Sequence, residues 1–307
     1  MYEIRFPNLG IVLDNVKDGF MIGNFEIRFY GMIIALGFIL AYCVIAGEAK
    51  RTKQDPELYL DFMLWLVVPS ILGARIYYVL FSLDDYIKEG QSVGQTILGM
   101  INIRGGGLAI YGGVIAGIIT VIVFSKVRHV KTMLMLDTIS MGMLVGQIIG
   151  RWGNFFNREA FGAYTNSLFA MAIPADWFGG KNYLVNKVNS GIITQEMIDN
   201  VVVFDGKEFL QMHPTFIYES LWNLMVLIVI FLYRRNKKFD GEMFGLYLWG
   251  YGLGRVWIEG LRTDSLMLPF ANFKVSQLLA ALCVLAASIY IIINRVKYQK
   301  SNEMQQV

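Results

Sequence analysis

The chain has 307 residues, of which 55% are hydrophobic and 17% are charged, and its mean hydropathy is +0.49. Soluble domains carry about 25% charged residues, so this composition excludes an ordinary soluble protein and indicates one that lies mostly in a lipid bilayer. The formal net charge of +3 is small and gives no reason to expect a nucleic-acid partner.

Apolar segments of roughly 20 residues recur along the chain, and a helix of that length crosses about 30 Å of hydrocarbon. They predict seven transmembrane helices, near residues 29–48, 58–81, 108–125, 133–150, 214–233, 243–261 and 275–294. The expected fold is therefore an all-α integral membrane protein, in which residues 1–307 form a single polytopic membrane domain.

Lysine and arginine are concentrated in alternate connections, at 50–53, 126–131 and 234–238, and in the tail at 295–300. Because short basic loops face the cytoplasm, we expect the N-terminus outside and the C-terminus in the cytoplasm. The polar segment 163–212 is too long for a tight turn. We predict that it forms a small external insertion between spans four and five.

The sequence shows no sign of a cleavable signal peptide, a disulfide or a metal site. No cleavable signal peptide is visible in residues 1–20, so the first span is expected to act as its own insertion signal. Cys43 and Cys283 lie inside predicted spans, where a buried apolar role is expected rather than a disulfide. His129 and His213 fall on opposite faces of the membrane, so neither a metal site nor a cofactor is predicted.

Polar side chains gather in one half of the predicted bundle. They are Tyr30, Arg75, Tyr111, Arg151, Glu159, His213, Arg255, Glu259 and Arg262. Scattered structural polar residues would divide evenly between the two leaflets. Their gathering therefore predicts one shared cavity that opens outward or sideways into lipid.

Three arginines of this group, Arg75, Arg151 and Arg255, indicate an anionic ligand. A guanidinium keeps its charge in a low-dielectric setting and binds phosphate oxygens with two parallel donors, which suits a phospholipid headgroup. The alternative is that the arginines snorkel, or pair with Glu159 and Glu259 to hold helices together.

The spacing within the sixth span supports a built site. Tyr251, Arg255 and Glu259 stand four residues apart, so they share one helix face. In the third span, Gly113 and Gly117 are predicted to let helices pack closely.

His213 stands directly before Pro214. Proline is favoured at the first position of a helix, so the pair predicts a helix start. His213 is also a candidate titrating group, because the pKa of histidine lies near the working pH.

The run 150–162 reads GRWGNFFNREAFG and resembles the signature of the prolipoprotein diacylglyceryl transferases of the bacterial cytoplasmic membrane. The similarity continues in five further segments, at 29–31, 73–76, 106–113, 213–219 and 251–259. It covers about residues 20–295, and a thirteen-residue signature with ordered further segments is a specific match.

The resemblance implies an enzyme that moves the diacylglyceryl group of phosphatidylglycerol to the lipobox cysteine thiol of a prolipoprotein signal peptide. A thioether forms and glycerol phosphate is released, as the first step of bacterial lipoprotein maturation. The implied partners are phosphatidylglycerol, prolipoprotein signal peptides and membrane lipid. The implied location is the bacterial cytoplasmic membrane, with a multi-pass chain and an active site toward the outer leaflet.

The resemblance also implies roles for individual residues. Arginines at the site would stabilise charge that develops on the leaving phosphate. The expected catalytic residues are Arg151, Arg255, Tyr111 and Glu259. The expected substrate-binding residues are Arg151, Asn154, Glu159, Tyr30, Arg75, Tyr251, Gly162 and His213.

One position departs from the family. Many members have a histidine where this chain has Tyr111, and a tyrosine with a pKa near 10 is a poor base at pH 7. Three alternatives stay open: Tyr111 orients the substrate, His213 supplies the base, or the arginines lower the pKa of the thiol. We favour orientation by Tyr111 and leave thiol activation unassigned.

A different class of function would also explain membrane arginines and helix-breaking glycines. A small-molecule transporter with an outward-facing anion site carries such residues. However, the predicted polar residues have no matching set in the inner half that would form a path across the membrane. A purely structural scaffold would not need so many charges at depth.

Overall fold

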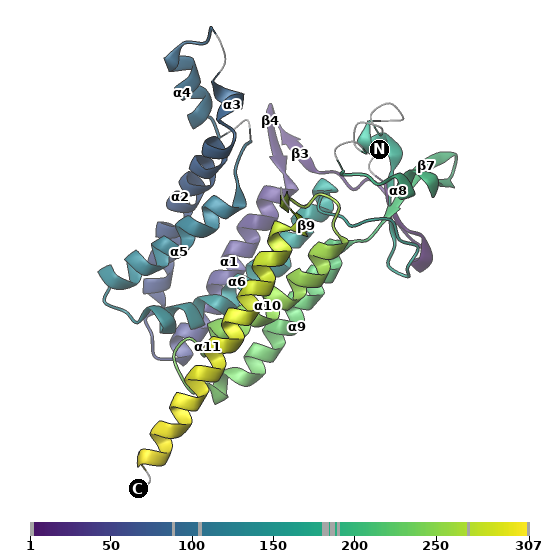
Figure 1. Ribbon diagram of the computed structural model, residues 1–307. Coiled ribbons are helices and arrows are strands. Elements are labelled where there is room, and N and C mark those ends of the chain that lie inside the picture. The colour runs from purple at the N-terminus through teal and green to yellow at the C-terminus, as the bar shows by residue number, and fades with distance from the viewer. Residues whose placement is uncertain are drawn as a thin grey trace. The chain divides into compact units, whose positions relative to one another are not determined.

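Seven long helices dominate the computed structural model, which describes residues 3–87, 90–103, 106–179, 184, 188, 191–268 and 271–305 (Figure 1). They are α1 (Phe29–Arg51), α2 (Pro56–Phe81), α5 (Ile110–Val127), α6 (Thr132–Asn157), α9 (Thr215–Tyr233), α10 (Glu242–Leu261) and α11 (Val275–Gln305). Each coincides with one predicted span. The described residues also form three short helices that were not predicted: α3 (Leu83–Tyr86), α4 (Val93–Ile101) and α8 (Gln195–Asp199).

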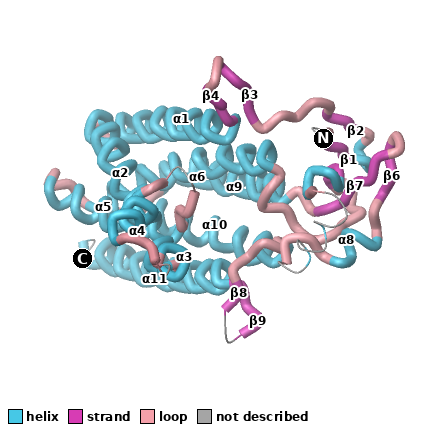
Figure 2. The backbone as a smooth tube through the Cα atoms, turned by 90° about the horizontal axis from the view of Figure 1, so that it is seen from above, coloured by secondary structure: helices cyan, strands magenta, loops and turns pink. Residues whose placement is uncertain are grey.

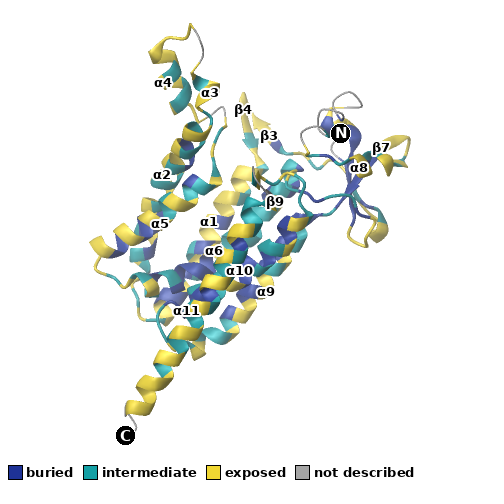
Figure 3. Ribbon diagram, viewed as in Figure 1, coloured by how far each residue is buried: buried dark blue, intermediate teal, exposed yellow. Residues whose placement is uncertain are grey.

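Six helical segments among the described residues are long and apolar enough to cross a membrane. They are Phe29–Arg51, Pro56–Phe81, Ile110–Val127, Thr132–Asn157, Thr215–Asn236 and Val275–Met304. Large apolar side chains on these helices are exposed, for example Ile39 at 59% and Leu232 at 76% (Figure 3). Apolar surface of this extent is expected to be covered by lipid, so the chain is a multi-pass membrane protein.

The chain divides into two compact units, Met1–Val44 with Ser140–Val307, and Ile45–Ile139. In the first unit, α10 packs against both α9 and α11 (Figures 1 and 2). A buried apolar core joins α6, α9 and α10, and it contains Met141, Leu144, Val226, Ile230 and Tyr247. This core fixes the three helices that carry the charged residues described below.

In the second unit, α2 and α5 pack against each other through glycines. A Cβ atom placed on Gly112 would lie 2.2 Å from the carbonyl oxygen of Gly73, so only glycine fits at this crossing. Gly113 and Gly117 also face α2, but a Cβ atom there would meet Ser70 or Leu66 at 3.4–3.5 Å. The predicted close packing therefore centres on Gly112.

The fold is mostly helical, as expected, but it is not all-α, because the first unit also contains a five-stranded antiparallel sheet in the order β2–β1–β5–β7–β6 (Figure 2). Its strands are β1 (Ile4–Phe6), β2 (Ile11–Leu13), β5 (Met171–Pro174), β6 (Val202–Phe204) and β7 (Lys207–Met212). Arg5 pairs with Ala172 across the sheet. The N-terminal residues thus share a core with the insertion, where Ile4 packs in one cluster with Ile173 and Leu210.

Two hairpins lead directly into long helices. Strands β3 (Gly19–Ile22) and β4 (Phe25–Arg28) precede α1, and strands β8 (Met267–Leu268) and β9 (Ala271–Lys274) precede α11. Three 3-10 turns complete the described elements, η1 (Pro7–Leu9), η2 (Ala175–Phe178) and η3 (Arg234–Asn236).

Candidate functional site

A buried carboxylate joins two of the predicted site arginines. Glu219 on α9 is 2% exposed, and one of its oxygens lies 2.5 Å from Nη2 of Arg151 on α6. Its other oxygen accepts a hydrogen bond of 3.1 Å from Nη1 of Arg255 on α10. Three helices therefore bring two positive charges onto one acid.

The helix face predicted for α10 is confirmed by its contacts. Arg255 pairs with Glu259 one turn later, and the Tyr251 side chain interacts with Arg151 and with the charges of Arg255 and Glu219. The two arginines and the two glutamates balance each other in charge. Because each buried charge has a partner, the cluster avoids the cost of an isolated ion in an apolar setting.

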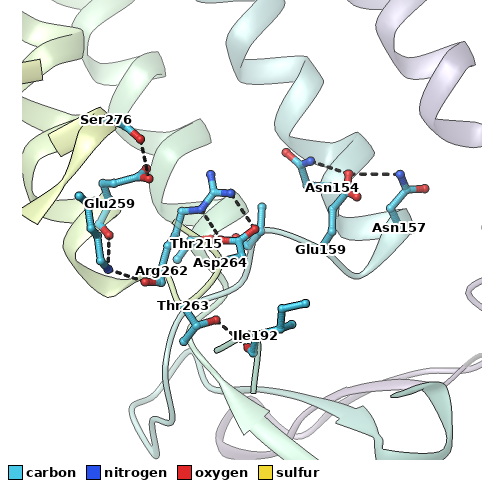
Figure 4. A network of polar contacts seen from close by, with 12 residues as sticks. Asn154, Asn157, Glu159, Ile192, Thr215, Glu259, Arg262, Thr263, Asp264 and Ser276 are labelled. Atoms are coloured by element: carbon cyan, nitrogen blue, oxygen red, sulfur yellow. Dashed lines mark hydrogen bonds and ion pairs between the residues drawn. The ribbon is translucent and has the colours of Figure 1, made fainter. Parts of the chain in front are cut away.

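Polar contacts continue from Arg151 into the turn after α6. Arg151 reaches the amide oxygen of Asn154 at 3.4 Å, and the Asn154 amide donates to Glu159 at 2.9 Å. Asn157 donates to the same Glu159 oxygen at 3.2 Å (Figure 4). Glu159 is therefore linked to Arg151 through the Asn154 amide.

The same turn has an unusual backbone. Arg158 and Ala160 have φ values of +51° and +57°, in the left-handed region that residues with side chains seldom adopt. Arg158 is held there by stacking 4.1 Å from the ring centre of Trp177 and by donating to the carbonyl of Phe156 at 3.2 Å. Strain of this kind persists where the surroundings fix it and is concentrated at functional sites.

Tyr30 lies beside this cluster at the start of α1. A Cβ atom placed on Gly153 would come within 2.7 Å of its ring, so the glycine lets the ring lie against α6. Tyr30 is also close enough to Arg151 and Glu159 to interact with both charges. The structure therefore brings this predicted site residue into the cluster.

Gly162 joins three chain segments through the backbone. Its N–H donates to the carbonyl of His213 at 3.0 Å, and it forms a β-bridge with Arg262. A Cβ atom there would lie 2.7 Å from Cβ of His213 and 2.9 Å from the carbonyl oxygen of Leu261. These contacts give Gly162 a packing role at the ends of α6, α9 and α10, and its role in substrate binding stays a prediction.

His213 precedes α9 as predicted, and its Nδ1 lies 3.3 Å from the Tyr218 hydroxyl. Burial lowers the pKa of His213 from its ordinary value of 6.5. The imidazole is therefore neutral at pH 7, and protonation favours the unfolded chain as the pH falls below about 6.5.

Between about pH 7 and about pH 5, the melting temperature of the His213→Gln variant is expected to fall less than that of the wild type. The variant lacks the histidine that takes up a proton on unfolding. Thermal unfolding in detergent across this pH range measures how steeply the melting temperature changes with pH. His129, the other histidine, is exposed, so His129→Gln should follow the wild type. If the melting temperatures of His213→Gln and the wild type change equally with pH, the lowered pKa of His213 is contradicted.

Two predicted site residues, Arg75 and Tyr111, belong to the second unit. Arg75 is 7% exposed. Its guanidinium donates four hydrogen bonds of 2.7–2.8 Å to backbone carbonyls, those of Gly99, Met100, Gly106 and Gly107. These contacts favour the alternative that Arg75 holds the chain together, and headgroup binding by Arg75 stays a prediction.

Tyr111 lies in the first turn of α5, with its ring centre 6.4 Å from that of Tyr77. Its position at the start of the third predicted span is confirmed.

Glu219 received no role from the sequence, although it lies in one of the segments that carry the resemblance. The available signal was a glutamate in the second turn of an apolar helix. An acid at such a depth in a membrane helix requires a partner. The sequence alone does not say that the partners are Arg151 and Arg255.

Comparison with known proteins gives a consistent result. The model of the prolipoprotein diacylglyceryl transferase family matches residues 18–293. The chain is 38% identical over 276 residues to phosphatidylglycerol–prolipoprotein diacylglyceryl transferase 1 of Clostridium perfringens, covering 89% of this chain and 92% of that protein. It is 40% identical over 278 residues to phosphatidylglycerol–prolipoprotein diacylglyceryl transferase of Streptococcus suis, covering 90% of this chain and 91% of that protein.

A third relative, from Listeria innocua, carries the same name and is 37% identical over 276 residues, covering 90% of this chain and 88% of that protein. The family match includes the signature 150–162 and every residue of the buried charge cluster. The chain belongs to the prolipoprotein diacylglyceryl transferase family.

Proposed function

We propose that this protein transfers the diacylglyceryl group of phosphatidylglycerol to the lipobox cysteine thiol of prolipoproteins. The family and the names of the relatives support the reaction class. The observation that carries the assignment to a site is the meeting of Arg151 and Arg255, from two helices, on the buried Glu219. The protein is proposed to need neither a metal nor a cofactor for this step.

The chemistry requires a leaving group with a stabilised charge. The thiol sulfur forms a bond to the terminal glycerol carbon of the diacylglyceryl group, while the bond from that carbon to the phosphate oxygen breaks. The thiol proton is released and glycerol phosphate departs with the bonding electrons. Fixed guanidinium donors near the phosphate lower the energy of this developing anion, and this is the role that we assign to Arg151 and Arg255.

Glu219 and Glu259 keep these donors in place before substrate binds. Each glutamate contacts Arg255, and Glu219 also contacts Arg151. Preorganised donors need no rearrangement at the moment of reaction. Asn154 and Tyr251, which contact Arg151, are proposed to orient it and to bind the headgroup, together with Tyr30 and Glu159.

Tyr111 is proposed to orient the substrate through its hydroxyl, with thiol activation unassigned. Tyr111→Phe is therefore expected to lower transfer by the equivalent of one hydrogen bond, roughly 0.5–1.5 kcal/mol, without moving the pH optimum. Tyr111→His should stay active, because the resemblance to the family implies that this position accepts histidine. Rates of transfer against pH measure both variants, and a shifted pH profile for Tyr111→Phe would mean that the tyrosine takes part in proton transfer.

We also propose seven spans, with α10 as the seventh, in a single membrane domain. α10 carries Arg255, Glu259 and five glycines, and it is the one long helix of the described residues that is not among the six candidate spans. It packs against α9 and α11, and a polar helix is tolerated in a bilayer where neighbouring helices cover it.

The basic connections then share one side, which supports a cytoplasmic C-terminus and an external N-terminus. The insertion 163–212 and the active site would face the outer leaflet of the bacterial cytoplasmic membrane.

A gel shift tests the proposed function. A lipobox peptide incubated with the purified protein and phosphatidylglycerol vesicles is expected to gain a diacylglyceryl group. A peptide with serine in place of its cysteine should stay unmodified. An unmodified cysteine peptide, with solute uptake into vesicles that contain the protein, would instead support the transporter alternative.

A further inference from the structure

The C-terminal end of α10 is capped through the backbone, where the Arg262 N–H donates to the carbonyl oxygen of Glu259 at 3.2 Å. The last four carbonyls of a helix have no partners within the helix, and a glycine in the left-handed region often ends it. Here the capping residue is Arg262, which is extended with φ −71° and ψ 145°. The side chain of Arg262 turns away to Asp264, with two contacts of 2.9 Å (Figure 4).

Lys274, the last residue of β9, adds side-chain donors at this helix end. Its Nζ atom donates to the carbonyl oxygens of Glu259 at 2.8 Å, Gly260 at 3.0 Å and Arg262 at 2.5 Å. An ammonium has three N–H donors, so all three are used at this helix end. Its positive charge also lies at the negative end of the helix dipole.

Two neighbours of Lys274 hold the same turn. Ser276 donates to the Glu259 carboxylate at 2.9 Å (Figure 4), and the Gln277 amide donates to the carbonyl of Val256 at 2.7 Å. The Glu259 backbone is thus held by Lys274 and its carboxylate by Ser276. That carboxylate pairs with Arg255, so the contacts run without a break from β9 to the cluster.

We propose that Lys274 is a positioning residue for the transfer reaction. It fixes the last turn of α10, and through Glu259 it sets the direction of the Arg255 guanidinium. The proposal rests on the function proposed above, in which Arg255 acts on the leaving phosphate. Because Lys274 acts on Arg255 through Glu259, its effect should fall on the rate of the chemical step more than on lipid binding.

The Lys274→Met variant tests this, because it keeps most of the length of the side chain and removes its donors. A displacement of about 1 Å at a reacting group can cost up to about 100-fold in rate. We expect kcat to fall about tenfold or more, and KM for phosphatidylglycerol to change less than about threefold. Lys274→Arg keeps charge and donors and should recover most of kcat.

Lys300 provides the matched control, because it is an exposed lysine near the end of α11. Lys300→Met should keep wild-type kcat and KM. Rates are normalised to folded protein by thermal unfolding of each variant. If Lys274→Met does not accumulate as folded protein, the same constants are measured on Lys274→Gln, which is polar but shorter and uncharged, and the same fall in kcat is expected.

Wild-type kcat in the folded Lys274→Met or Lys274→Gln protein overturns the proposal, as does a loss that Lys274→Arg does not recover. A loss explained wholly by a smaller folded fraction also overturns it. A wild-type protein that does not modify the peptide overturns the proposed function instead, so the two failures are distinguishable.

Discussion

Replacing Arg255 with lysine is expected to lower kcat for diacylglyceryl transfer by about 10²–10³-fold, the usual effect of removing one preorganised donor to a developing anion. Arg255 contacts both Glu219 and Glu259. A lysine ammonium is a point charge on a flexible stem and cannot reproduce the planar guanidinium, which contacts two carboxylates and is proposed to bind the phosphate. The measurement is the initial rate at saturating phosphatidylglycerol.

Arg235 offers a matched control for this substitution. It is exposed on η3, away from the charge cluster in the sequence, so Arg235→Lys should keep the wild-type rate. Both variants must unfold near the wild-type temperature for the comparison to hold. Near-normal transfer by folded Arg255→Lys would contradict the proposed catalytic role of Arg255.

Replacing Glu219 with glutamine is expected to have the largest effect on stability. The substitution keeps the shape of the side chain but leaves Arg151 and Arg255 facing each other without the shared carboxylate. Removing one partner of a buried ion pair costs about 3–5 kcal/mol. Thermal unfolding in detergent should therefore show a much lower melting temperature, and transfer activity should fall with it.

The exposed Glu303 is the control for Glu219, and Glu303→Gln should unfold like the wild type. The double variant Arg151→Gln with Glu219→Gln removes one charge of each sign and should recover part of the lost stability. A Glu219→Gln protein with the wild-type melting temperature would mean that the ion pairs contribute little to the fold.

Much of the helical architecture could be predicted from the sequence. A run of about 20 apolar residues has few alternatives to a membrane helix, and each predicted span coincides with a long helix. The sheet could not be predicted in the same way. Its strands are three to six residues long, and β1 pairs with β5, where Arg5 lies opposite Ala172.

The spacing of residues along one helix predicts the Arg255–Glu259 pair, but it cannot predict the bridge that Glu219 makes between helices. The contact of Arg255 with Glu259 follows from their separation of four residues on one helix. The bridge made by Glu219 joins α6, α9 and α10, and such contacts depend on how helices pack. Arg75 shows the reverse case, because its depth resembles that of a ligand-binding arginine, whereas its donors meet backbone carbonyls of a neighbouring segment.

The central claim is that the arginine cluster promotes departure of glycerol phosphate while the diacylglyceryl group moves to sulfur. Phosphatidylglycerol labelled separately in its two glycerol groups tests this claim most directly, with the purified protein and a lipobox peptide. The account predicts that the acylated glycerol label appears on the peptide, that the headgroup label appears in water-soluble glycerol phosphate in equal amount, and that Arg255→Lys lowers both together. Headgroup label on the peptide, or peptide modification without release of glycerol phosphate, would contradict it.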